Sequence, residues 1–257
     1  MRAGRLATLA VAGMLVVSGL AGCQAKPTVA AYVDDVVITE AQVDAVMDEL
    51  RASLEEFSEN WFAQEEQRLA AAEELTDAER EAELAALRQR EDERLQRELA
   101  TRRDQVVQLR VLTEAARRYA QQQQVEVAEP APEAVAEQVG LPADHAYVTV
   151  VAEYFAVMTP LQGTVTPVEP SEADQREVYD RLVAAGQTSV PFAEAQQVLT
   201  ADVLGEAVAI RNLFREILDG VKVRVNPRYD AVYQVPVEFP GGQTWLAVPL
   251  SDSAVDR

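Results

Sequence analysis

A long segment from Glu55 to Gln124 contains no proline and no glycine and is rich in Ala, Glu, Gln, Arg and Leu. These residues have high intrinsic helix propensities, so the segment predicts α-helix along its length. Within it, Thr76 and Glu79 have the spacing of a capping box, which satisfies the free N–H groups at a helix start. We therefore expect at least two helices with a break near Leu75, in a protein that is mainly α with small β elements.

The second of these helices carries an apolar seam. Leu95, Leu99, Val106 and Leu109 recur at helical spacing, and the other faces carry Glu and Arg at spacings that allow ion pairs along the helix. A charged face of this kind is typical of solvent exposure. The pattern allows a coiled-coil hairpin, but Arg102 interrupts the seam, so a long regular zipper is not expected.

Two short β-branched segments precede the helices. Val29 to Val33 and Val36 to Ile38 flank the pair Asp34-Asp35. Aspartate tolerates the backbone conformations of tight turns, so we expect a small hairpin here. Thr39 follows as an N-cap with Gln42 three residues later, which is again the spacing of a capping box. The sequence therefore predicts strand, turn, strand and helix in that order.

The rest of the chain divides into shorter elements. Residues 128–142 are interpreted as a linker, because they contain Glu129-Pro130-Ala131-Pro132, with one short helix before Gly140. Residues 143–220 are expected to form a second helical segment, with helices at 144–162, 172–185, 192–199 and 202–218. The alternation of Val221 to Val225 predicts a strand, and residues 231–257 predict a hairpin around Pro240-Gly241-Gly242 followed by a tail.

The N-terminus has the pattern of an export signal. Arg2 and Arg5 precede an apolar run that is too short for a stable membrane span. The run ends at Leu20-Ala21-Gly22-Cys23, which resembles the lipobox of bacterial lipoproteins and holds the only cysteine. The resemblance implies a thioether-linked lipid on Cys23 and cleavage before it, so residues 1–22 would be a signal peptide and residues 23–28 a lipidated tether. The expected location is the extracytoplasmic face of the cell membrane, with membrane lipid as a partner through acylated Cys23.

The charge of the chain argues against one class of partner. The formal net charge is −20 at pH 7, and it becomes −22 once residues 1–22, which hold two arginines and no acid, are removed. No cluster of lysine or arginine offsets this charge, so we expect no binding to nucleic acid. No cysteine follows Cys23, so folding outside the cytoplasm has to rely on packing rather than on disulfides.

Two segments far apart in the sequence point to one family. Ala31 to Thr39 is similar to the opening of SurA-type N-terminal domains, where Ala-x-Val-Asn-Gly-x-x-Ile-Thr precedes the first helix, with Asp34-Asp35 in place of the usual Asn-Gly. Val223 to Tyr229 resembles the closing strand of the same superfamily, which includes the PrsA-like foldases. The resemblance implies a SurA- and trigger-factor-like helical chaperone domain made of residues 29–127 and 221–230. In such a domain the late strand pairs with the N-terminal hairpin.

Full-length members of this superfamily carry a parvulin prolyl isomerase domain, whose signature includes two histidines and a glycine-rich loop. This chain has one histidine, His145, so the resemblance does not extend to that domain. His145 lies at an expected helix start, where a capping or solvated role is favoured over catalysis. The sequence also lacks a His or Cys cluster for a metal, a Gly-x-Ser-x-Gly nucleophile and a phosphate-binding loop. We therefore expect no catalytic residue, no metal and no cofactor.

Two hypotheses about function follow. The first is a holdase chaperone that shields unfolded or exported polypeptides in an apolar crevice, since methionine and aromatic side chains adapt to varied apolar ligands. The candidate client-binding residues are Met47, Phe57, Trp61, Phe62, Phe155 and Met158. For any one of them, a place in the helical core is the alternative. The second hypothesis is a lipid-tethered adaptor that docks one cell-envelope partner through a flat helical face. A degenerate peptidyl-prolyl isomerase is the third alternative.

Overall fold

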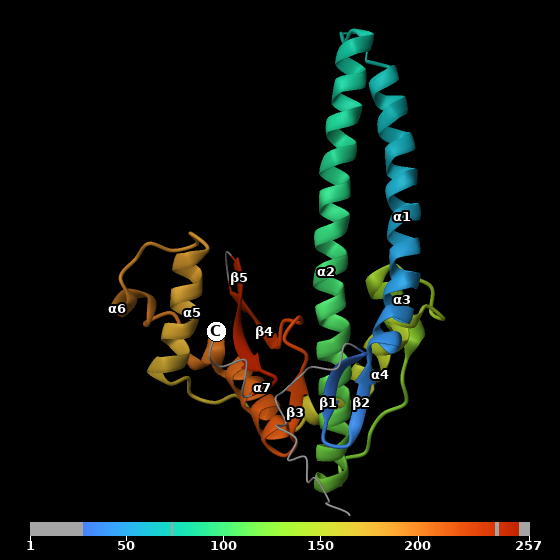
Figure 1. Ribbon diagram of the computed structural model, residues 1–257. Coiled ribbons are helices and arrows are strands. Elements are labelled where there is room, and N and C mark those ends of the chain that lie inside the picture. The colour runs from blue at the N-terminus through green and yellow to red at the C-terminus, as the bar shows by residue number, and fades with distance from the viewer. Residues whose placement is uncertain (1–27, 73, 240–241, 252–257) are drawn as a thin grey trace, which may run out of the picture.

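The computed structural model describes residues 28–72, 74–239 and 242–251. Two long helices, α1 (Glu40–Ala70) and α2 (Asp77–Gln123), form an antiparallel hairpin that extends away from the rest of the molecule (Figure 1). The shorter helices are α3 (Pro132–Val139), α4 (Ala146–Gln162), α5 (Glu172–Ala184), α6 (Phe192–Ala195) and α7 (Ala201–Asp219). The strands are β1 (Val29–Val33), β2 (Val36–Thr39), β3 (Val223–Val225), β4 (Val232–Phe239) and β5 (Gly242–Pro249). The prediction of a mainly helical protein with small β elements is confirmed.

Reciprocal side-chain caps set the starts of the two long helices. Gln42 N–H donates to the Thr39 hydroxyl at 3.2 Å, and Thr39 N–H donates to the Gln42 side-chain oxygen at 2.8 Å. Thr76 and Glu79 make the same pair of bonds at the start of α2. A cap of this kind contributes about 1 kcal/mol to stability. Both predicted capping boxes are confirmed, and the predicted break near Leu75 lies between the two helices.

The early and late parts of the described chain meet in one sheet. β1 lies at the centre of the order β2-β1-β3 and pairs antiparallel with both neighbours. Ala31 lies opposite Val225 and Val33 lies opposite Val223. The prediction that the late strand returns to the N-terminal hairpin is therefore confirmed, although the strand begins at Val223 rather than at Val221.

The turn between β1 and β2 is stabilised by both its backbone and its side chains. Asp34 has a φ of 51°, in the left-handed region that aspartate tolerates better than most residues. Its carboxylate accepts a hydrogen bond from Lys222 N–H at 2.9 Å and pairs with Arg118 at 3.0 Å. These contacts explain how Asp34-Asp35 forms a turn where the SurA-type pattern has Asn-Gly.

One buried hydrophobic cluster joins the three-stranded sheet, residues 43–50 of α1, residues 95–120 of α2, and helices α4 and α7. The buried residues of α2 begin at Leu95 and continue through Val106, Val107 and Leu112, because α1, α4, α7 and β1 all pack around this part of the helix. Residues 77–94 of α2 contribute no buried side chain. We call residues 55–72 and 74–94 the arm, since this part of the hairpin extends beyond the core (Figure 1).

The C-terminal hairpin belongs to the same core. β4 and β5 pair antiparallel and pack against α7 and α5. Val235 and Val237 of β4 and Leu246 and Val248 of β5 are buried in the cluster. The predicted hairpin is confirmed by this pairing, while residues 240 and 241 of its turn lie outside the described residues. Residues 128–142, interpreted as a linker, contain α3, which packs against α4.

Most of the predicted helix bounds agree with the structure to within a few residues. The segment predicted as a helix over 192–199 is the exception, because α6 ends at Ala195 and the chain continues in turns. The Leu199 carbonyl accepts a hydrogen bond from the Gln175 side chain of α5 at 2.8 Å. A contact with another helix therefore satisfies a backbone group near the end of this segment.

The predicted anchor is outside the part of the chain that the structure describes. Residues 1–22, the lipobox residues Leu20, Ala21 and Gly22, and the expected lipidation site Cys23 all precede residue 28. None of the helices in the described ranges is both long enough and apolar enough to span a membrane. The lipid anchor thus stays a prediction from the sequence.

Candidate functional site

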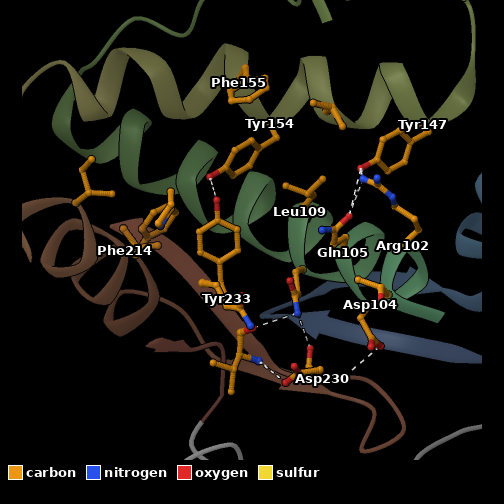
Figure 2. A pocket seen from close by; sticks show the side chains of 18 of the residues that line it. Arg102, Asp104, Gln105, Leu109, Tyr147, Tyr154, Phe155, Phe214, Asp230 and Tyr233 are labelled. Carbon is orange, nitrogen blue, oxygen red and sulfur yellow. Dashed lines mark hydrogen bonds between the residues drawn. The ribbon is translucent and has the colours of Figure 1, made fainter. Parts of the chain in front are cut away.

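A groove of about 800 Å³ lies between α2, α4, α7 and β4. Figure 2 shows the side chains that line it. Its polar half is formed mainly by Arg102, Asp104 and Gln105 of α2 with Tyr147 of α4 and Asp230 before β4; its aromatic half is formed by Tyr154 and Phe155 of α4, Phe214 of α7 and Tyr233 of β4. The groove is the place where α2, the second helical segment and the C-terminal hairpin come together.

The aromatic half has a buried floor and one accessible ring. Tyr154 and Tyr233 point toward each other, and their hydroxyl oxygens lie 2.7 Å apart (Figure 2). The Phe214 ring lies 4.9 Å from the Tyr233 ring, and the Phe155 ring lies 5.5 Å from the Tyr154 ring, measured between centroids. Tyr154 and Phe214 are buried, whereas 42% of Phe155 is exposed. Phe155 is therefore the ring that a bound molecule would meet first.

Burial keeps this half of the groove uncharged. It raises the pKa of the Tyr154 phenol well above its ordinary value of 10.0, and the neighbouring Tyr233 adds to that shift. Burial also raises the pKa of Tyr233, although the hydrogen bond with Tyr154 opposes the shift. Both phenols are neutral at physiological pH and pair with each other, so neither hydroxyl depends on a ligand for a hydrogen bond.

The polar half centres on Arg102. Its Nη1 donates to the Tyr147 hydroxyl at 3.0 Å and to the Gln105 side-chain oxygen at 3.2 Å (Figure 2). Its Nε donates to Glu98 at 2.9 Å. Burial acts to lower the pKa of Arg102, but Tyr147 and Glu98 outweigh it and raise that pKa. Arg102 thus stays charged, and Glu98 balances its charge.

A second polar network joins α2 to the start of β4. The Gln108 side-chain amide donates to the Asp230 carbonyl at 2.9 Å and to the Val232 carbonyl at 3.2 Å. Asp230 N–H donates to the Asp104 carboxylate at 3.2 Å, and Val232 N–H donates to the Asp230 carboxylate at 3.1 Å. These bonds fix the separation of α2 and β4 and hence the width of the groove.

The carboxylates of this network give the groove a negative end. Burial raises the pKa of Asp104, and the hydrogen bond from Asp230 N–H opposes that shift. Across the described residues, neither Asp104 nor Asp230 takes part in an ion pair. Because Arg102 is balanced by Glu98, a basic group in the bound molecule is favoured over an acidic one.

The six candidate client-binding residues from the sequence do not gather at one place. Met47 and Met158 are 4% and 0% exposed and belong to the core, so they do not line an open crevice. Phe57, Trp61 and Phe62 lie on the arm; Phe57 is 65% exposed, and the Trp61 and Phe62 rings meet at 5.1 Å. Of the six, only Phe155 lines the groove.

The residues that form most of the groove were missed by the sequence analysis. Tyr147, Val151 and Tyr154 recur at helical spacing and share one face of α4. This pattern could have predicted an aromatic face on the helix. Tyr233 lies 79 positions from Tyr154 and meets it only because β4 packs on α7. No local pattern indicates that contact.

His145 is the N-cap of α4. Its Nδ1 accepts a hydrogen bond from Tyr147 N–H at 3.0 Å, and its side chain is buried. The predicted capping role is confirmed. In the described ranges, no group of three or more His, Cys, Asp or Glu side chains is placed to hold a metal ion.

Comparisons of the chain with protein-family models, with curated protein sequences and with solved structures gave no match. The basis for a functional assignment is therefore the groove and the residues of this chain.

Proposed function

We propose that this chain is a lipid-anchored extracytoplasmic holdase that shields unfolded segments of exported polypeptides in the groove. The observation that carries the proposal is the position of Phe155. Its exposed ring borders both the groove and a second hollow of about 420 Å³ between α3 and α4, which is lined largely by alanine. An apolar surface thus continues across α4, and such a surface accepts varied apolar side chains without requiring one shape.

The arrangement of the chain ends supports a SurA- and trigger-factor-like domain. The resemblance of the two end segments implies a late strand paired with the N-terminal hairpin, and β3 does pair with β1. Residues 29–127 and 221–230 would form that domain. The helices and hairpin between and after these ranges would then complete the client-binding groove.

The charge of the chain suits a holdase near a membrane. A net charge of −20 for the whole sequence favours clients with basic segments and keeps a complex with an apolar client soluble. Asp104 and Asp230 place part of that charge at the groove itself. Nucleic acid is not a partner in this proposal, because its phosphates would be repelled.

The proposal includes no catalytic step, cofactor or metal. His145 is occupied as a helix cap, and its Nδ1 is engaged by Tyr147 N–H. A proline peptide should therefore isomerise in the presence of the protein at the uncatalysed rate, over tens to hundreds of seconds. Acceleration that is lost in His145→Asn, a substitution that keeps a capping side chain, would contradict this part of the proposal.

The proposal is tested by replacing the accessible ring of the groove. Phe155→Ser should weaken binding of a fluorescently labelled, permanently unfolded polypeptide about tenfold, which corresponds to about 1.4 kcal/mol. Val183→Ser is a matched control, because Val183 is 44% exposed on α5 and does not line the groove. Both variants should keep the melting temperature of the wild type to within a few degrees, since neither residue is buried. Equal loss of binding in both variants would contradict the proposal.

The arm supports the adaptor as a second candidate. It carries Phe57 in an exposed position and extends away from the core, as expected of a docking surface for one partner. Photo-crosslinking side chains at positions 57 and 155 would distinguish the two functions in cells. A holdase should give a heterogeneous set of products from position 155. An adaptor should give one discrete product from position 57 and none from position 155.

A further inference from the structure

The sheet of β4 and β5 directs its backbone groups alternately toward and away from the paired strand. Leu250 N–H donates to the Ala231 carbonyl at 2.8 Å, and Tyr233 lies opposite Val248 in the register. Hydrogen bonding alternates along an antiparallel strand, so Tyr233 and every second residue after it bond to β5. The backbone groups of Val232, Gln234, Pro236 and Glu238 therefore point away from β5. Proline at position 236 agrees with this alternation, because a residue that faces away from β5 needs no N–H for the hydrogen bonds between the two strands.

Side chains from neighbouring segments bond some of the outward-facing backbone groups. On β5, Glu177 accepts a hydrogen bond from Ala247 N–H at 2.8 Å, and Arg181 donates to the Trp245 carbonyl at 3.0 Å. On β4, the N–H and C=O of Val232 are bonded to Asp230 and Gln108. The edges of the sheet are thus closed where α5 and α2 approach them.

At Gln234 both outward backbone groups, the N–H and the C=O, are open to the groove. Gln234 is exposed and lines the groove beside Pro236. Within the described residues, no hydrogen bond reaches its outward N–H or C=O. An unpaired edge of a strand is a template for another extended chain. Here that edge borders an aromatic floor and a pair of carboxylates.

We propose that the outward N–H and C=O of Gln234 bind the main chain of an extended client segment, which adds to the edge of β4 as a short strand. This inference rests on the proposed holdase function and names the conformation of its clients. Only an extended segment has free backbone groups at the spacing of a strand, whereas a helix has already paired its own. Pro236 offers no N–H, so the added strand is short and the recognition tolerates many sequences.

The chemistry around the edge defines the preferred segment. Side chains alternate between the two faces of a strand, so the residues of the segment that face α4 would meet Phe155. The carboxylates of Asp104 and Asp230, which take part in no ion pair among the described residues, lie at the polar end of the same groove and favour a basic residue there. The favoured occupant is an extended segment in which aromatic or aliphatic residues alternate with lysine or arginine.

The first test changes the edge of the protein. Gln234→Pro removes the outward N–H without removing a bond to β5. It should weaken the binding of a short labelled peptide of alternating tyrosine and lysine about tenfold. Glu238→Pro is the matched control, because it removes an outward N–H from the same edge outside the groove. Gln234→Ala is a second control, since it keeps the N–H and changes only the side chain. Both controls should bind the peptide within about twofold of the wild type.

The second test changes the peptide and does not depend on how well a variant folds. The same peptide with N-methyl groups on alternate backbone amides keeps its side chains but cannot pair with a strand edge on that side. The N-methylated peptide should bind the wild type about tenfold more weakly than the unmodified peptide. Gln234→Pro should not lower the affinity for the N-methylated peptide any further.

The outcomes separate this inference from the proposed function. If Phe155→Ser weakens the peptide while N-methylation and Gln234→Pro do not, the groove binds clients through side chains alone and the inference is wrong. If the wild type binds the labelled unfolded polypeptide but not this peptide, the inference alone is wrong; if it binds neither, both proposals are wrong. If Gln234→Pro instead abolishes a dimer of this chain and leaves peptide binding unchanged, the edge pairs with a second copy and the inference is again overturned.

Discussion

Tyr229 donates a hydrogen bond of 2.5 Å to Glu40 Oε2, which joins residues that lie 189 positions apart in the sequence. The same oxygen is paired with Arg228 and with Arg103. Glu40 is buried at the start of α1, and Tyr229 is buried just after β3. This contact therefore ties the two ends of the proposed chaperone domain together beside the sheet in which they pair.

Removal of that hydrogen bond should loosen the connection between the ends. Tyr229→Phe keeps the ring and should lower the free energy of unfolding by about 1.5–3 kcal/mol, because the bond is to a charged group. Tyr32→Phe on β1 is the control, since its hydroxyl has no hydrogen bond among the described residues and the change should be nearly neutral. Urea denaturation of both variants checks this, and equal stability of the two would contradict a role for the Tyr229 contact.

The pair of tyrosines under the groove should behave as one unit. Tyr233→Phe leaves the buried Tyr154 hydroxyl without a partner and should lower the free energy of unfolding by about 1–3 kcal/mol. Replacing both tyrosines by phenylalanine should restore the stability to within about 1 kcal/mol of the wild type, because neither hydroxyl is then left unpaired. A double-mutant cycle in urea measures this coupling. Additive losses in the double variant would show that the two hydroxyls do not depend on each other.

Asp174 should make the protein sensitive to acid. Burial acts to raise its pKa, but hydrogen bonds from Arg211 and Ser171 outweigh it and hold the pKa below the ordinary value of 3.8. A lowered folded-state pKa gives a stabilising contribution that is present above the unfolded-state pKa and is lost as pH falls through the folded-state value. Arg211 is 4% exposed, so Asp174→Asn leaves a buried guanidinium without its main counter-ion.

The expected loss for Asp174→Asn at neutral pH is about 3 kcal/mol, toward the lower end for a broken buried pair, because Glu177 lies 3.8 Å from Arg211 and remains. The difference between the variant and the wild type should begin to shrink as pH falls below about 4, the ordinary pKa of an unfolded aspartate, and it should vanish as pH falls through the lower folded-state pKa. Glu172→Gln, at an exposed position on the first turn of the same helix, should match the wild type throughout. A difference that does not change with pH would contradict this account.

Local features of the fold could be predicted from the sequence because they depend on residues close together. The capping box of Thr39 and Gln42 needs only a spacing of three, and the hairpin at Asp34 needs only a turn residue between β-branched segments. The alternation of Val223 and Val225 predicted a strand, and the resemblance of the two end segments to SurA-type domains implied its pairing with the N-terminal hairpin.

The groove could not be predicted in the same way. Phe155 and Met158 lie three positions apart on α4, yet Phe155 faces the groove while Met158 is fully enclosed by the core. Helical spacing identifies an apolar face, but it does not say which part of that face another element will cover. That depends on where α1 and α2 pack against α4, which is a property of contacts distant in sequence.

The lipid anchor should depend on one thiol. Only cysteine can carry the thioether-linked lipid that the lipobox resemblance implies, so Cys23→Ser should abolish lipidation and leave the chain uncleaved or shed from the membrane fraction. Metabolic labelling with a fatty-acid analogue and membrane fractionation check this in a bacterium that processes lipoproteins. Unchanged labelling and partitioning of the variant would rule out the anchor.

The central claim is that the groove shields unfolded chains, and aggregation of an unrelated, chemically unfolded protein tests it most directly. Light scattering after dilution from denaturant should fall when the wild type is present at stoichiometric amounts, and Val183→Ser should suppress it equally well. Phe155→Ser should suppress it clearly less at an unchanged melting temperature, because it removes the accessible ring of the groove without disturbing the core. Scattering that is insensitive to the wild type, or suppressed equally by Phe155→Ser, would contradict the account.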